Sequence, residues 1–264
     1  MNTGLNTTLV DLERAARRNG GVIRLASDED SEQATGSIGG GVSRKRLTTV
    51  LGELARNGSV VRAGTGRYIL RLERGNFNAL AAGPRLTRGR AYVSMWNVAE
   101  QARLTMNTPR LVSVVVDRQP TEPVLRVPAI DTIFYFHAIA PSRFFGFSEQ
   151  PVGDGLTTPI AGVEKALVDM LYFVDAPDVP PASEIFGMWE EAASSATVNP
   201  RLLVKHVIRM DSPAVARRVG YFMERYGIKG SDDLLVLRGD SKYFVPLLGV
   251  RELLNLPANR WFVR

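Results

Sequence analysis

The 264-residue sequence predicts an α+β protein with two parts, a small basic N-terminal unit and a larger mixed α/β domain. Three observations lead to this class. The first part shows a helical repeat followed by two short β-rich runs, and the second mixes β-branched runs with longer amphipathic segments. The positive charge is concentrated near the N-terminal end. We therefore expect one domain over residues 1–75, a connection over 76–90 and a second domain over 91–264.

The charge is distributed unevenly along the chain. Residues 40–90 contain eleven Lys and Arg against two Asp and Glu, a balance of +9, whereas residues 1–39 balance to −2 and residues 91–264 to −1. A concentrated basic segment is typical of proteins that bind a polyanion, because each cation placed on a phosphate releases a condensed counterion. A solvated basic face without a partner gives the same count, so the arrangement of the segment has to decide.

The first helix is expected at Thr8–Arg18, where apolar residues recur every three or four positions and Asn19-Gly20-Gly21 stops the repeat. Val22–Leu25 suits a short strand. The acidic stretch Ser27–Thr35 allows a short second helix, and the glycine-rich run Gly36–Gly41 predicts a loop.

The clearest helix is predicted at Arg44–Asn57. Ser43 is a suitable N-cap, and Asn57-Gly58 provides the stop. Two β-rich runs follow, Ser59–Arg62 and Arg67–Leu70, and the glycine-containing turn between them indicates a hairpin. A basic helix followed directly by a hairpin is the order of a recognition helix and its wing. The sequence therefore predicts a winged helix-turn-helix unit that binds double-stranded DNA.

Basic, hydroxyl-bearing or very small side chains make up most of the outward face of this helix. Such side chains reach phosphates and guanine edges, or let a backbone approach closely. We expect the first three basic residues to hold the helix N-terminus on the DNA, the two threonines to face the groove, and the hairpin to reach the adjacent backbone. The predicted DNA-binding residues are Arg44, Lys45, Arg46, Thr48, Thr49, Arg56, Arg62, Thr65 and Arg67.

The second part alternates strand and helix patterns. Leu111–Val116 is a run of mostly β-branched residues, which predicts a buried strand, and Val163–Val174 has one apolar face, which predicts a helix. The remaining predictions are strands at Val124–Ile130, Ile133–Ala140 and Leu234–Leu237, and helices at Tyr92–Arg103, Glu184–Ala193, Arg201–Met210 and Ala214–Tyr226.

The residues offer little for catalysis. Cysteine is absent, so thiol nucleophiles and thiolate metal sites are excluded. His137 lies in an apolar run and is expected to be a hydrogen-bonded core residue, and His206 is expected to be exposed. Neither belongs to a zinc-binding H-E-x-x-H frame, and no G-x-S-x-G elbow or phosphate-binding P-loop occurs. We predict no catalytic residue, no metal, no cofactor and no enzymatic activity.

One enzyme class shows a partial match. Nucleotidyltransferases carry Gly-Ser followed about ten residues later by two carboxylates that hold two metal ions. Gly230-Ser231 and Asp240 begin such a pattern, but the second carboxylate position is Lys242. A cation cannot serve as a metal ligand, so the match is rejected.

Two phrases in the second part resemble a known family. Thr158–Tyr172 contains Glu-Lys-Ala-Leu-Val-Asp, and Ala216–Gly227 contains Arg-Arg-Val-Gly-Tyr. Both resemble phrases of the AbiEi-type antitoxins of abortive-infection operons, and Tyr92-Val93-Ser94 and Arg260-Trp261 are similar to the ends of that domain. The resemblance covers residues 40–264. It departs at Gly162-Val163, where the family has Ser-Pro, and in the indistinct first half of the helix-turn-helix.

The resemblance implies a protein with two activities. The winged helix would repress its own operon by binding inverted repeats in the promoter. The second domain would oppose a nucleotidyltransferase toxin, in a type IV arrangement without a stable complex. For Glu164, Lys165 and Asp169 we expect an intrahelical ion pair and a cap to a neighbouring loop, with a direct antitoxic role as the other possibility.

Two alternatives stay open. The chain could be a stand-alone winged-helix regulator whose large domain senses a small ligand, or an enzyme that uses the basic unit to dock a nucleic acid. The N-terminal residues lack the features of a signal peptide, and no run of about eighteen apolar residues occurs. We therefore expect no membrane association and a cytoplasmic location.

Overall fold

The computed structural model describes most of the chain. Ser27–Thr35, Gly36–Gly41, Thr65, Asp240 and Lys242, which figure in the predictions above, lie outside the described residues. Side chains are described from Val10 in the first helix and from Lys45 in the helix that begins at Arg44. The described residues are 3–24, 44–63, 66–70, 77–239, 243–248 and 256–264.

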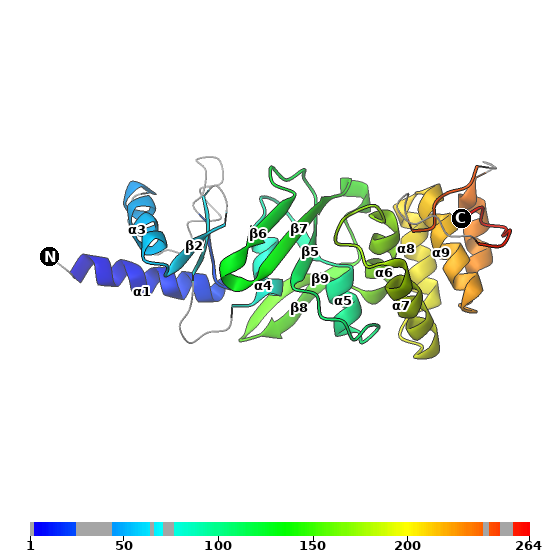
Figure 1. Ribbon diagram of the computed structural model, residues 1–264, viewed down its shortest axis with the longest axis horizontal. Helices are drawn as coiled ribbons and strands as arrows, with labels where there is room; N and C mark the ends of the chain where they lie inside the picture. The colour runs from blue at the N-terminus through cyan, green and yellow to red at the C-terminus, as the bar shows by residue number, and fades with distance from the viewer. Residues whose placement is uncertain (1–2, 25–43, 64–65, 71–76, 240–242, 249–255) are drawn as a thin grey trace.

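The molecule is elongated (Figure 1). The described residues from 3 to 70, called the N-terminal unit, form one end, a six-stranded sheet lies in the middle, and a group of helices forms the other end. Residues 77–264 are called the large domain. Helices and strands are mixed in the large domain and both parts contain a sheet, which confirms the α+β class.

Among its described residues, the N-terminal unit has two helices and a three-stranded antiparallel sheet of order β1-β3-β2. The helices pack on the sheet through a small apolar cluster that includes Leu12, Leu51, Val60 and Tyr68. The periodicity that predicted both helices is the reason, since it places their apolar residues on the side facing the sheet. The elements are α1 (Thr3–Arg18), β1 (Val22–Arg24), α3 (Arg44–Arg56), β2 (Val60–Arg62) and β3 (Arg67–Leu70).

The large domain is built on a mixed six-stranded sheet of order β6-β7-β5-β4-β9-β8. The pairs β5–β7 and β4–β9 are parallel, and the other neighbours are antiparallel. Strands β4 and β5 are buried on both faces, which explains their nearly continuous apolar sequences. The strands are β4 (Ala91–Val93), β5 (Leu111–Val116), β6 (Val124–Val127), β7 (Thr132–Ala138), β8 (Phe147–Gly153) and β9 (Leu156–Ala161).

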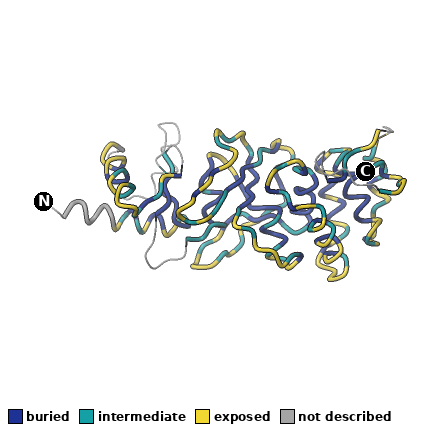
Figure 2. Tube along the Cα trace, in the orientation of Figure 1, coloured by how far each residue is buried: buried dark blue, intermediate teal, exposed yellow. Residues whose placement is uncertain are grey.

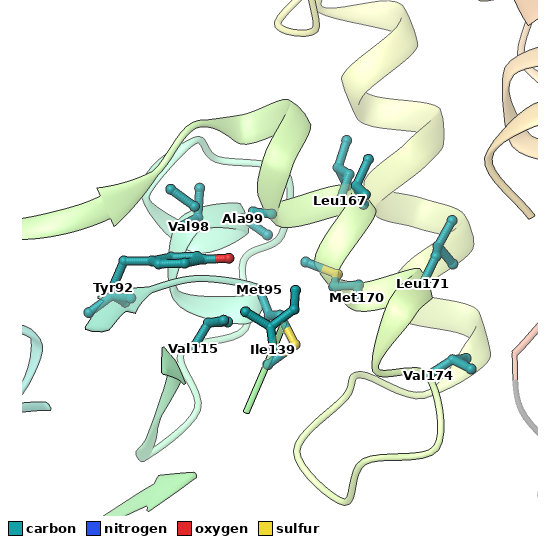
Figure 3. Close-up of a cluster of buried hydrophobic side chains, with 14 of the residues drawn as sticks. Tyr92, Met95, Val98, Ala99, Val115, Ile139, Leu167, Met170, Leu171 and Val174 are labelled. Atoms are coloured by element: carbon teal, nitrogen blue, oxygen red, sulfur yellow. The ribbon is translucent and has the colours of Figure 1, made fainter. Parts of the chain in front are cut away.

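Helices cover both faces of this sheet. Gly83 of α4 approaches Val112 and Val114 on one face. Because side chains alternate along a strand, Val115 points to the opposite face, where it belongs to the apolar cluster that contains Ile139 and, from α6, Met170 (Figure 3). The helices of the large domain are α4 (Ala79–Arg85), α5 (Trp96–Gln101), α6 (Val163–Tyr172), α7 (Ala182–Ser194), α8 (Pro200–Met210) and α9 (Pro213–Arg225), with short 3-10 turns η2 (Pro128–Ile130), η3 (Pro141–Arg143) and η4 (Ser231–Arg238).

Residues 77–90, expected to be a connection, form part of the large domain. Asn78 caps α4 through its side chain and also donates from Nδ2 to the carbonyl of Val152 at 2.6 Å. Arg85 donates to the carbonyl of Thr157 at 2.9 Å. The helix is only seven residues long and contains Pro84, so the sequence shows no sustained period. These two hydrogen bonds join α4 to the β8–β9 hairpin.

In the large domain one further prediction was partly wrong, one was wrong, and one hairpin was missed. The expected helix at Tyr92–Arg103 is strand β4 followed by α5, because Met95 adopts a positive φ of 54° that separates them. The expected strand at Leu234–Leu237 lies in the 3-10 turn η4. The hairpin β8–β9 was missed, since exposed polar residues and a proline dilute the strand pattern of its edge strand.

The other strands and helices predicted in the large domain are present with shifts at their ends. Within the part of the chain that the structure describes, the helices are too short or too polar to span a lipid bilayer.

Candidate nucleic-acid interface

Helix α3 has one buried and one exposed face. Leu47, Val50 and Leu51 are buried against the three-stranded sheet. The opposite side is open to solvent, as the exposed positions along α3 in Figure 2 show. The predicted residues Lys45, Arg46, Thr48, Thr49 and Arg56 are all exposed there.

The exposed side of α3 has few obstacles to a close approach. A Cβ added at Gly52 would have no atom within 4 Å. The Thr49 hydroxyl donates to the carbonyl of Lys45 at 3.0 Å, and the Arg56 Nε donates to the carbonyl of Gly52 at 3.4 Å. These bonds stay within the helix, so they orient the side chains without removing them from the surface.

The first turn of α3 combines two sources of positive potential. It contains no acidic residue and begins with three basic ones, Arg44, Lys45 and Arg46. The N-terminal end of any helix also carries partial positive charge from its unpaired N–H groups. Both favour an anion at this end of the helix.

Of the two arginines predicted to bind DNA from the hairpin after α3, only one is exposed to solvent. Arg62 ends β2 and is exposed, opposite Tyr68 in the antiparallel register. Arg67 lies in a different environment: its guanidinium donates to the carbonyl of Leu86 at 2.8 Å and to the carboxylate of Glu122 at 2.9 Å. Only 18% of its side chain is exposed. Its prediction as a phosphate contact is corrected, because both contacts lie in the large domain.

The large domain places its most notable charged groups inside. Lys165 and Asp169 form a fully buried ion pair one helical turn apart on α6. The Asp169 carboxylate also accepts from the hydroxyls of Tyr92 at 3.1 Å and Ser94 at 2.8 Å, and Lys165 Nζ donates to the Tyr92 hydroxyl at 2.9 Å. Burial, and then the charge of Asp169, raises the pKa of Tyr92 well above its ordinary value. These buried polar side chains therefore find hydrogen-bond partners in one another.

The ion pair and the cap expected for Glu164, Lys165 and Asp169 are confirmed. Besides the ion pair, Glu164 accepts a hydrogen bond of 2.7 Å from the backbone N–H of Asn199. Asn199 is the N-cap of α8, so Glu164 joins the start of α6 to the start of α8.

The Arg-Arg-Val-Gly-Tyr phrase holds the C-terminal segment. Arg217 donates to the carbonyls of Arg238 and Tyr243, and Arg218 donates to those of Pro246 and Leu171. A Cβ at Gly220 would lie 2.3 Å from the ring of Trp261, so only glycine admits this indole. The phrases that carry the family resemblance thus contact one another, although they are far apart in the sequence.

A serine, a histidine and an aspartate also meet in the large domain. Ser113 Oγ donates to Asp178 Oδ2 at 2.6 Å, and His137 Nε2 lies 2.9 Å from the same oxygen. In a hydrolase triad the imidazole would accept the serine proton. Here the serine donates to the carboxylate, so it is not activated as a nucleophile. The expectation that His137 is a hydrogen-bonded core residue is confirmed.

His206 corrects another prediction, since it is buried rather than exposed. Its ring lies 5.4 Å from the ring of Phe145. Burial, and then the charge of Lys165, lowers its pKa below the ordinary value. Among the described residues, no three His, Asp or Glu side chains gather in a way that could hold a metal ion.

Neither the family models nor the curated proteins compared with this chain give a match.

Proposed function

We propose that this protein binds double-stranded DNA through a winged helix-turn-helix unit in which α3 is the recognition helix and the β2–β3 hairpin is the wing. The observation that carries the proposal is the exposed face of α3, where Lys45, Arg46 and Arg56 surround two hydroxyls and an open glycine position. The element order supports it, because α3 is followed directly by the antiparallel hairpin.

The proposed contacts follow from side-chain chemistry. Arg44, Lys45 and Arg46 place the positive end of α3 against phosphates, and Thr48 and Thr49 face base edges in the major groove. Arg62 reaches the neighbouring backbone from the hairpin. Cations contribute affinity that depends on salt, and the hydroxyls contribute orientation and part of the specificity.

The test is a gel-shift titration of the full-length protein on its own upstream DNA over a range of salt. Replacing Lys45 by Ala should weaken binding to every duplex and reduce the slope of log affinity against log salt by about one unit. Lys205→Ala is the matched control, since it removes an equally exposed lysine from α8 in the large domain. No salt-sensitive shift by the wild-type protein would contradict the proposal.

We further propose that the protein is the autorepressor and antitoxin of a type IV operon, opposing a nucleotidyltransferase toxin. The sequence resemblance supports this role, and its phrases form the buried contacts around Lys165 and Trp261. Co-expression with an adjacent nucleotidyltransferase gene tests it, with growth as the readout. A full-length double variant, Lys45→Ala with Arg46→Ala, should lose repression and keep the rescue of growth.

The alternative, a stand-alone regulator with a ligand-sensing domain, gives other results. The neighbouring reading frame would then lack a nucleotidyltransferase with an intact carboxylate pair, or wild-type protein would fail to rescue growth. DNA binding would be unchanged under that alternative, so the two proposals are tested separately.

A further inference from the structure

Arg67 links the N-terminal unit to the large domain. It begins β3, the central strand of the three-stranded sheet. Its guanidinium donates to the Leu86 carbonyl at 2.8 Å and the Glu122 carboxylate at 2.9 Å, and both residues belong to the large domain. An arginine fork that binds two acceptors holds its orientation better than a single hydrogen bond does.

Close apolar packing surrounds this link. Val22 and Ile69 of the N-terminal sheet are buried in the same cluster as Ala82 and Leu86 of the large domain. At Gly20 the approach is so close that an added Cβ would lie 2.7 Å from the Cβ of Ala81. The two parts therefore share a core, whereas domains that move independently are usually joined by exposed linkers with few contacts.

The link continues from β3 to α3. Tyr68 and Leu70, which follow Arg67 on β3, are buried in the apolar cluster of the N-terminal unit. The same cluster contains Val50 and Leu51 of α3. A fixed β3 consequently fixes α3 through packed side chains.

We propose that Arg67 and Glu122 are positioning residues that hold α3 at a set angle to the large domain, so that the protein meets DNA as one rigid body. The proposal rests on the proposed DNA binding. In this proposal Arg67 orients α3 and does not itself contact a phosphate. It also couples the two parts: displacement of the segment around Glu122 changes DNA affinity, and DNA binding stabilises that segment by the same free energy.

A distance measurement tests the rigid link without DNA. Because the chain has no cysteine, spin labels attach only at introduced ones, and Glu53→Cys on α3 and Gln101→Cys on α5 are exposed sites in the two parts. The wild-type background should give one narrow distance distribution. Arg67→Ala and Glu122→Gln should each broaden or shift it, whereas Arg62→Ala, which removes an exposed arginine from the same hairpin, should leave it unchanged.

DNA titrations then separate positioning from charge. Glu122→Gln removes a negative charge, so simple electrostatics predicts tighter binding, whereas the positioning role predicts weaker binding by about two- to thirtyfold. Arg67→Ala should weaken binding at every salt concentration while the salt slope stays unchanged. By contrast, a phosphate contact at Arg67 would lower the slope by about one unit.

The outcomes distinguish this inference from the proposed function. A distance distribution that stays narrow and unshifted in both Arg67→Ala and Glu122→Gln would overturn the positioning role even if the protein binds DNA. Tighter DNA binding by Glu122→Gln would also overturn it. Failure of the wild-type protein to bind DNA would contradict the proposed function and leave the distance result to decide whether the two parts are rigidly joined.

Discussion

The exposed face of α3 and the interior of the large domain use basic residues in different ways. On α3 the basic side chains Lys45, Arg46 and Arg56 are exposed. In the large domain Lys165 and Arg218 are buried and bind internal acceptors, a carboxylate for the lysine and backbone carbonyls for the arginine. Residue type is therefore a poor guide to function until the acceptors of each cation are known.

Arg67 is a basic residue of the N-terminal unit that, like the buried cations of the large domain, binds acceptors within the protein. Arg67 lies within the basic segment and begins a strand of the proposed wing, which is a position expected for a residue that contacts phosphate. Its acceptors, however, are in the large domain. Arg56 on α3 donates within its own helix, whereas Arg67 donates across to the large domain, and this marks Arg67 as a structural link.

The largest effect is expected from the buried lysine. Lys165→Met removes the cation and leaves the buried Asp169 carboxylate with hydroxyl donors alone. Breaking a buried ion pair on one side costs about 3–5 kcal/mol of unfolding free energy. Denaturant titration followed by circular dichroism measures it, and Lys205→Met on the exposed side of α8 should change stability by less than about 0.5 kcal/mol. Equal losses of stability in the two variants would show that the buried lysine contributes no more than the exposed one.

A glycine pair provides the next test. Gly220→Ala on α9 would place a methyl group 2.3 Å from the Trp261 ring, and such overpacking typically costs about 1–3 kcal/mol. Gly187→Ala on α7 has no atom within 4 Å of the new Cβ and should stabilise the helix by about 0.5–1 kcal/mol. Gly220→Ala should lower the melting temperature, and Gly187→Ala should raise it. A Gly220→Ala variant as stable as wild type would show that Trp261 can move aside.

The sequence predicted those features that depend on local patterns. The apolar repeat of α3 and the β-branched run of β5 identify their elements because each pattern matches the geometry of one regular structure. The missed features depend on distant partners. Seven-residue α4 is joined by hydrogen bonds to the β8–β9 hairpin, and His206 is buried where α8 packs on α6.

The candidate interface shows the same division. The spacing of Lys45, Thr48 and Thr49 places them on one helical face, and the structure leaves that face exposed. The link from Arg67 to Glu122 spans 55 positions and joins two parts of the fold, so no local pattern indicates it.

A smaller effect is expected at the cap of α8. The Asn199 side chain accepts from the N–H groups of Arg201 and Leu202, and its own N–H donates to Glu164. Asn199→Ala keeps the backbone bond and removes the side-chain cap, which costs about 1 kcal/mol. Asn199→Asp restores an accepting oxygen and should recover most of that loss in denaturant titration. If Asn199→Ala matches wild type in stability, the cap contributes nothing measurable.

The smallest effect concerns His206 and extends the comparison to pH. Burial, then the charges of Lys165 and Arg209, lower its folded-state pKa, with Glu164 and Asp169 acting in the opposite direction. The unfolded state binds more protons between the lowered pKa and the ordinary value of about 6.5, so stability decreases as pH falls through this window.

His206→Gln removes this dependence and leaves every other titrating group in place. The free energy of unfolding should therefore fall less steeply between pH 7 and about pH 5 in the variant than in wild type, and the two curves should run parallel above pH 7. Binding to DNA at pH 7 should be unaffected, because the residue lies on α8 and is neutral there. Parallel stability curves over the whole range would mean that the buried imidazole gains its proton as easily in the folded protein as in the unfolded chain.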